Sequence, residues 1–276
     1  MDHFSVDAYT PKEIAAQIEK VGISKSIGDP SRLFALAILA GSFIAFGAVF
    51  FTLVTHDSMG VAAGLMRLIG GVVFCLGLIF VVVAGGELFT GNNLIVMAYV
   101  DGKVTFSQLM RNWVLVYAGN FVGALGILVL IYLSGHWQIG QGGVGAKVIA
   151  IANAKVNMSW VEAFTRGILC NILVCMAIWL CFAGRTVVDK VLAILFPITA
   201  FVAMGFEHSV ANMYFIPAGL LASQQAELVQ LAGNINLENL TVAGFLVKNL
   251  LPVTLGNIVG GSVFVGLFYW FIYLRD

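Results

Sequence analysis

Long apolar segments dominate the sequence and limit how the chain can fold. Six can be laid down, over residues 32–55, 65–83 with 94–100, 105–133, 159–182, 187–206 with 215–222, and 246–274. A helix needs about 20 mostly apolar residues to cross the hydrocarbon core of a bilayer, and the alternating pattern of a membrane β-barrel is absent. With 60% hydrophobic residues and a mean hydropathy of +0.98, the chain lies outside the range of soluble domains. The sequence predicts an all-α integral membrane protein with six transmembrane helices.

Two of these segments are interrupted by polar residues at the depth where a continuous helix is expected. The first interruption reads Gly-Glu-Leu-Phe-Thr-Gly-Asn and contains Glu87 and Asn92. The second reads Gly-Phe-Glu-His-Ser-Val-Ala-Asn and contains Glu207 and Asn212 at the same spacing. Backbone that leaves the helix at membrane depth is tolerated only where it is buried in protein or lines a cavity. We therefore expect two broken helices, one in each half of the chain, that meet at a pore.

The third and sixth segments also share a pattern. Arg-Asn is followed by Gly-Asn-Phe-Val-Gly, which ends at Gly123, and Lys-Asn is followed at the same internal spacing by Gly-Asn-Ile-Val-Gly, which ends at Gly260. With three helices in each half, the second half must enter the membrane from the opposite side, so the sequence predicts an inverted 3+3 repeat. We interpret the Gly residues as sites of close helix contact and the Asn residues as hydrogen-bonding groups between helices.

The first part of the chain is polar and amphipathic. Residues 1–30 are predicted to form an N-terminal cytoplasmic helix and linker, and residues 31–276 the transmembrane channel domain. Thr10 and Glu13 have the spacing of a capping box, and Pro11 occupies the first helical position. This helix either anchors the chain in the membrane interface or plugs the cytoplasmic mouth of the pore. No apolar core of a cleavable signal peptide precedes it, so we expect the N-terminus to be retained.

The distribution of basic residues predicts the orientation of the chain. An even number of spans places both termini on one side, where nine Lys and Arg residues are expected, against five on the other. Because basic residues favour the cytoplasmic side, both termini are predicted to be cytoplasmic. The 14 basic and 14 acidic residues cancel and form no basic stripe, which argues against nucleic-acid binding.

No set of residues suited to catalysis or metal binding stands out. Four cysteines fall inside apolar segments without C-x-x-C spacing and are predicted to be buried thiols with no metal or disulfide role, namely Cys75, Cys170, Cys175 and Cys181. Ser209 follows His208 directly, but adjacent residues rarely reach catalytic geometry. We expect neither enzymatic activity nor a cofactor. A membrane enzyme or a structural membrane subunit remains the alternative from another class, and the duplicated polar break favours a channel.

The motifs described so far, together with Asn249–Asn257 and the aromatic run near the C-terminus, resemble the formate/nitrite transporter family over nearly the whole chain. The resemblance implies an aquaporin-like protomer without Asn-Pro-Ala boxes, assembled as a homopentamer in the bacterial inner membrane with a pore in each protomer. It implies bidirectional, pH-dependent passage of formate and related small monovalent anions. Nitrite or hydrosulfide is the alternative substrate within the family.

The resemblance also implies a set of pathway residues. The substrate pathway would contain four polar residues, His208, Thr90, Asn171 and Lys155. Apolar constrictions would be formed by Phe74, Leu78, Leu88, Phe89, Val174 and Phe201.

His208 is the one histidine of four that the sequence places at membrane depth, and an ionisable residue there is a functional hypothesis. Lys155 and the N-termini of the half-helices would attract an anion, and Thr90 and Asn171 would replace its water. In water, proton transfer from His to a carboxylate of pKa ~3.7 costs about 4 kcal/mol, but desolvation favours the neutral form of both groups. We therefore expect His208 to act as proton donor and acceptor.

Two glutamates precede the predicted half-helices. Glu87 and Glu207 are interpreted as caps for the unpaired N–H groups of these helices, with Asn92 and Asn212 as further support of the breaks. A role for the two carboxylates as proton relays is the alternative.

Overall fold

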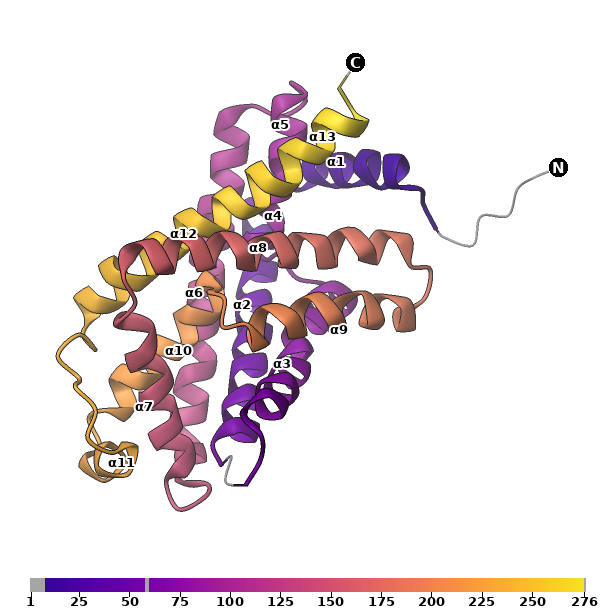
Figure 1. Ribbon diagram of the computed structural model, residues 1–276. Helices are drawn as coiled ribbons and strands as arrows, with labels where there is room; N and C mark the ends of the chain where they lie inside the picture. The colour runs from indigo at the N-terminus through magenta and orange to yellow at the C-terminus, as the bar shows by residue number, and fades with distance from the viewer. Residues whose placement is uncertain (1–7, 58–59, 276) are drawn as a thin grey trace.

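The computed structural model describes residues 8–57 and 60–275. Over this part of the chain every regular element is a helix and there is no strand (Figure 1), which confirms the predicted all-α fold. Among the described residues, five helices are long and apolar enough to cross a membrane, Pro30–Thr55, Ala63–Gly85, Phe106–Leu133, Trp160–Ala183 and Gly244–Tyr273. The fifth segment, which was predicted to be broken, is divided into two shorter helices. All four cysteines are buried as free thiols.

The N-terminal helix α1 (Pro11–Ile27) begins at the predicted capping box of Thr10 and Glu13. It lies at the same end of the molecule as α5 and α13 (Figure 1). Its apolar face is buried, and its buried Glu19 bonds to Lys103 Nζ at 2.6 Å. The first seven residues of the predicted N-terminal region lie outside the described residues.

Reciprocal side-chain caps start several of the membrane helices. α2 (Pro30–Thr55) starts at Asp29, whose carboxylate accepts a bond from the backbone of Arg32. Capping boxes are present at Thr105 for α6 (Phe106–Leu133) and at Ser159 for α8 (Trp160–Ala183). A further capping box, at Thr186, starts α9 (Val187–Ala203). These local signals fix the boundaries because each satisfies N–H groups that the helix itself cannot pair.

Both predicted helix breaks are present. α3 (Ala63–Ile79) continues as a π-helix to Gly85, where φ is +93°. After a short extended stretch, α4 (Phe89–Asn92) and α5 (Val96–Val100) follow, joined by a 3₁₀ turn. The second break lies between α9 and α10 (Ser209–Ala222) and contains Gly205 at φ +73°. Both glycines adopt the left-handed conformation that commonly ends a helix.

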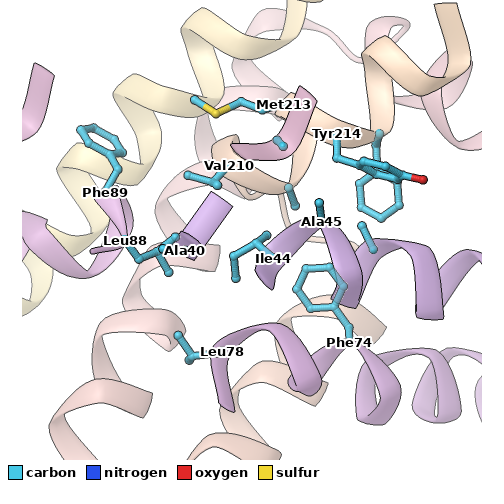
Figure 2. Packing of buried hydrophobic residues seen from close by; sticks show 14 of the residues in the cluster. Ala40, Ile44, Ala45, Phe74, Leu78, Leu88, Phe89, Val210, Met213 and Tyr214 are labelled. Atoms are coloured by element: carbon cyan, nitrogen blue, oxygen red, sulfur yellow. The ribbon is translucent and has the colours of Figure 1, made fainter. Parts of the chain in front are cut away.

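Three shorter or irregular elements complete the fold. α7 (Gly143–Val156) and α11 (Ala226–Ala232) lie at the end of the molecule opposite α1 (Figure 1). The last spanning helix runs over 244–273 and alternates between π-helical and α-helical turns, with α12 (Leu251–Ile258) and α13 (Phe268–Tyr273) as its α-helical parts. Ala40, Ile44 and Ala45 of α2 pack in the core beside α3 and α10 (Figure 2).

Glycines allow two pairs of helices to approach closely. A Cβ on Gly41 or Gly123 would overlap backbone oxygens across the contact between α2 and α6. A Cβ on Gly256 or Gly260 would do the same between α8 and the last helix. These contacts support the interpretation of the repeated glycines as sites of close helix contact.

Replacing Gly41 with Ala is expected to destabilise the protein by about 1–3 kcal/mol, because the new methyl group overlaps the backbone of Asn120. Gly126→Ala is the matched control, since Gly126 lies on α6 with no atom within 4 Å of its added Cβ. Thermal unfolding of the purified variants in detergent would measure the stability of Gly41→Ala and of Gly126→Ala. Equal stability of the two variants would contradict the close contact of α2 with α6.

Candidate functional site

A hydrogen-bonded network holds the first break. Asn92 Nδ2 donates to Glu87 Oε2 at 2.7 Å and to Asn112 Oδ1 at 2.9 Å. Lys25 Nζ lies 3.1 Å from Glu87 Oε2 and 2.8 Å from Asn92 Oδ1. The backbone oxygen of Lys25 accepts a bond from Asn112 Nδ2 at 3.1 Å. The network thus joins α1, the break and α6.

A second network of the same composition holds the second break. Asn212 Nδ2 donates to Glu207 Oε2 and to Asn249 Oδ1, each at 2.7 Å. Lys155 Nζ lies 2.7 Å from Glu207 Oε1, and the backbone oxygen of Lys155 accepts from Asn249 Nδ2 at 3.0 Å. The side chains of Lys155 and Glu207 are 15% and 5% exposed, against 29% and 12% for Lys25 and Glu87. The second ion pair is therefore further removed from water.

The half-helices are capped by asparagines, and the predicted capping by glutamates is wrong. Asn120 Oδ1 accepts from the backbone N–H of Phe89 at 2.9 Å, and Asn257 Oδ1 accepts from that of Ser209 at 2.9 Å. The Nδ2 groups of the same asparagines donate to the backbone oxygens of Glu87 at 2.8 Å and Glu207 at 3.0 Å. The two carboxylates are occupied by Lys and Asn side chains, so they support the breaks by another route.

Lys25 was not among the predicted pathway residues, although a signal for it exists. Lys25 stands four residues before Asp29, the N-cap of α2, and Lys155 stands four residues before Ser159, the N-cap of α8. Lys155 itself lies in the last turn of α7. The shared spacing before an N-cap places each lysine within reach of a break.

His208 and Thr90 meet where the two breaks face each other. His208 Nε2 lies 2.9 Å from Thr90 Oγ1. His208 is the N-cap of α10, and its Nδ1 accepts from the backbone N–H of Ala211 at 3.1 Å. An accepting Nδ1 carries no hydrogen, so the ring is neutral and its Nε2–H donates to Thr90. The ring of Phe201 stacks on the imidazole with centroids 6.0 Å apart.

Three cavities bear on the role of this pair. The first vestibule, of about 260 Å³, contains Lys155 and His208 in its wall. The second vestibule, of about 110 Å³, lies beside α1 and contains Lys25. A central cavity of about 10 Å³ adjoins the first vestibule and is lined by Ile44, Phe74, Leu78, Leu88, Val174, Ile198, Phe201 and His208. A cavity needs ~10–15 Å³ to hold one water, so the centre is closed to an anion in this conformation.

Five of the six predicted constriction residues line the central cavity, namely Phe74, Leu78, Leu88, Val174 and Phe201. Phe74 and Phe201 also line the first vestibule and pack edge to face at 5.8 Å, so they separate the two spaces. Phe89 is the exception. It lines a groove between α6 and α12 and packs on Tyr117 at 4.8 Å, apart from Phe74 (Figure 2). Leu88 is extended, and successive side chains of extended backbone point to opposite sides.

Asn171 is buried and does not belong to the lining of these three cavities. Its Nδ2 donates to the backbone oxygens of Thr90 at 3.2 Å and Asn257 at 2.7 Å, and to Asn93 Oδ1 at 2.8 Å. Asn171 therefore holds the backbone of Thr90, whose hydroxyl faces His208. In this conformation its contact with the pathway is indirect.

Comparison with known proteins places this geometry in a family. The family model for formate/nitrite transporters matches residues 12–271. The chain is 43% identical to the formate channel FocA of Escherichia coli (strain K12) over 274 residues, 98% of this chain and 96% of that one. It is 44% identical to FocA of Haemophilus influenzae, covering 95% and 93%. These relatives are named as channels, in agreement with the prediction of a non-enzymatic membrane protein.

Solved structures agree with the sequence relatives. A pentameric formate channel with formate bound matches with a TM-score of 0.83 and 41% identity, over 89% of this chain and 98% of that one. An FNT family ion channel matches with a TM-score of 0.78 and 29% identity, over 95% and 98%. The resemblance found in the sequence motifs is thereby confirmed, and the chain belongs to the formate/nitrite transporter family.

Proposed function

We propose that the protein is a bidirectional channel for formate and related small monovalent anions. The observation that carries the proposal is the pair of His208 and Thr90, in which His208 lines both a closed apolar centre and the first vestibule. Each of the two vestibules has a lysine in its wall. The names of the E. coli and H. influenzae relatives as formate channels support formate as the substrate.

The proposed architecture is an aquaporin-like inverted repeat of six spans with two broken helices. Its support is that the two break networks share most of their contacts, and that each polar residue of the first has a counterpart in the second: Lys25 with Lys155, Glu87 with Glu207, Asn92 with Asn212, Asn112 with Asn249, and Asn120 with Asn257. In this scheme α1 corresponds to α7. Residues 1–30 precede the transmembrane domain along the chain, yet α1 belongs to the first repeat.

We propose a homopentamer in the bacterial inner membrane with both termini cytoplasmic. The pentameric state of the formate channel matched above supports the assembly. The excess of basic residues on the side of the termini supports the orientation. The second vestibule, beside α1, then opens to the cytoplasm, and the first vestibule opens to the outside.

The proposed mechanism follows from the sizes and polar groups of the three cavities. An anion enters the first vestibule near Lys155, and Phe74 and Phe201 must separate before it reaches the centre. There the Nε2–H of His208 and the hydroxyl of Thr90 replace its water. The neutral ring must first take a second proton from the water of a vestibule, because only the imidazolium can give up a proton and return to the neutral form. If the imidazolium then passes one proton to the anion, a neutral acid crosses the apolar centre and His208 is left neutral. The neutral acid is indifferent to the membrane potential, which is worth about 2.3 kcal/mol per unit charge per 100 mV.

Uptake of labelled formate into proteoliposomes that contain the purified protein tests the function. We expect saturable formate flux both into and out of the liposomes, and this flux should be faster at acidic pH. Empty liposomes are the control, because neutral formic acid crosses lipid by itself. Uptake equal to that of empty liposomes at every pH would refute the proposal.

Phe201→Leu is expected to widen the passage between the first vestibule and the centre. The ratio of acetate to formate uptake should rise by roughly tenfold, the lower end of the discrimination that one methylene supports in a shaped pocket. Phe89→Leu is the matched control, because its ring lies in the groove outside the central cavity. The same rise in both variants would contradict the constriction at Phe201.

A further inference from the structure

Arg166 lies in the wall of the first vestibule, next to the second break. Its backbone oxygen accepts from the N–H of Glu207 at 3.2 Å, which fixes its position on α8. Its side chain is 43% exposed and lines the vestibule together with Lys155. The backbone of this residue is therefore part of the protein's framework, while the guanidinium borders the space through which an anion would enter.

The contacts of the Arg166 guanidinium within the protein are weak. Its Nη1 lies 3.5 Å from the backbone oxygen of Gly205, at the outer limit of a hydrogen bond. Its Nη2 lies 4.0 Å from Glu162 Oε1, and Glu162 is 54% exposed and also bonded to Ser159. Exposed pairs of this kind contribute at most about 1 kcal/mol. With five N–H donors, the guanidinium retains donors for water or an anion.

Arg166 leaves the lining of the first vestibule with one more cation than anion. The other two charged groups in this lining, Lys155 and Glu207, lie 2.7 Å apart and offset each other. Glu162, 4.0 Å from the guanidinium, lies outside the lining and is 54% exposed, so water and salt weaken its effect on Arg166. Close to the wall of the vestibule the guanidinium therefore supplies the attraction, and the lysine acts after the anion has arrived.

The second vestibule has no equivalent of this cation among its described lining residues. The backbone oxygen of Leu36 accepts from the N–H of Glu87 at 3.1 Å, as that of Arg166 does from Glu207. Leu36 is thus the counterpart of Arg166, and its side chain is apolar. Lys25 is the cation in the lining there and is paired with Glu87 at 3.1 Å.

We propose that Arg166 captures the carboxylate of the incoming substrate at the mouth of the first vestibule. This inference rests on the proposed function. A planar guanidinium can donate two parallel bonds to a carboxylate, which a lysine cannot do. Its attraction extends over a Debye length of about 10 Å at 0.1 M salt. The channel is therefore asymmetric: the half-saturating concentration of formate is lower at the face that carries Arg166 than at the opposite face.

Initial rates of labelled formate uptake in right-side-out and inside-out membrane vesicles test the proposal. In right-side-out vesicles, Arg166→Gln should raise the half-saturating concentration roughly two- to fivefold at low salt and leave the maximal flux unchanged. The difference should shrink at 1 M salt, where the Debye length is about 3 Å. Arg166→Lys keeps the charge but not the two parallel donors of the guanidinium. Its half-saturating concentration should therefore lie between those of the wild type and Arg166→Gln.

Two further variants separate capture from a general effect of surface charge. Arg67→Gln removes a charge from an exposed position on α3 that does not line the first vestibule, and it should leave the half-saturating concentration unchanged. Leu36→Arg should lower the half-saturating concentration of formate in inside-out vesicles. Equal kinetics of Arg166→Gln and wild type in both vesicle types, or an equal change in Arg67→Gln, would overturn the proposal. Wild-type vesicles without formate uptake would instead refute the proposed function.

Discussion

Replacing His208 with Asn is expected to abolish the pH dependence of formate uptake between about pH 5 and 8, the range in which histidine ordinarily titrates. Flux of the anion at neutral pH should persist. Asn is the informative substitution because its side-chain oxygen caps helices well and can replace Nδ1 as acceptor for Ala211. The variant removes the titratable group and keeps an acceptor that caps the first turn of α10. Uptake into proteoliposomes across this pH range would measure the change.

The protonation of His208 is linked to the start of α10. A second proton on the ring would sit on Nδ1 and face the N–H of Ala211, so the cap bond would be lost. His56→Asn is the control, since His56 lies at the end of α2 and outside the three cavities. A His208→Asn channel whose uptake still rises at acidic pH, after subtraction of empty liposomes, would eliminate His208 as the proton donor.

Replacing Lys155 with Met is expected to lower the free energy of unfolding by about 3–5 kcal/mol. The substitution leaves the carboxylate of Glu207, only 5% exposed, without its cation. Lys25→Met should lower the free energy of unfolding by a smaller amount. The side chain of Glu87 is 12% exposed, and its cation lies farther away, at 3.1 Å. Thermal or denaturant unfolding of the purified protein in detergent compares the two variants.

A second substitution identifies the cause of this loss. Adding Glu207→Gln to Lys155→Met removes the unpaired charge and keeps an amide that can bond to Asn212, so most of the lost stability should return. If the double variant is as unstable as Lys155→Met alone, the unpaired carboxylate is not the cause, and the loss is assigned to the other contact of the ammonium, with the ring of Phe215 at 5.4 Å from its centroid.

The helices could be predicted from the sequence because their causes are local. Length and apolarity identified the spans, and the capping box of Thr10 and Glu13 gave the start of α1. The breaks were predictable because polar residues at membrane depth require a cavity or a partner. The resemblance placed His208 and Thr90 in one substrate pathway, but their hydrogen bond was not predicted, since the sequence pattern does not say which side chains of the two breaks touch.

The predictions that differ from the structure depend on tertiary contacts. Glu87 precedes a half-helix, as a capping residue would, but Asn120 of α6 reaches the same N–H groups from a distant part of the chain. Phe89 lies between two residues that face the centre, and only the extended backbone at Leu88 turns its ring towards α6. Arg166 has no local signal, because its place in the vestibule is set by a break about 40 residues away.

The contacts of Lys25 bear on how the role of the N-terminal region should be examined. Both its ammonium and its backbone oxygen are bonded within the first break network. Truncation that removes α1 would therefore leave a carboxylate and two amides unsatisfied inside the protein, and a loss of transport would report damage to the pore wall rather than the absence of a regulator. Affinity tags attached ahead of Thr10 avoid this confusion.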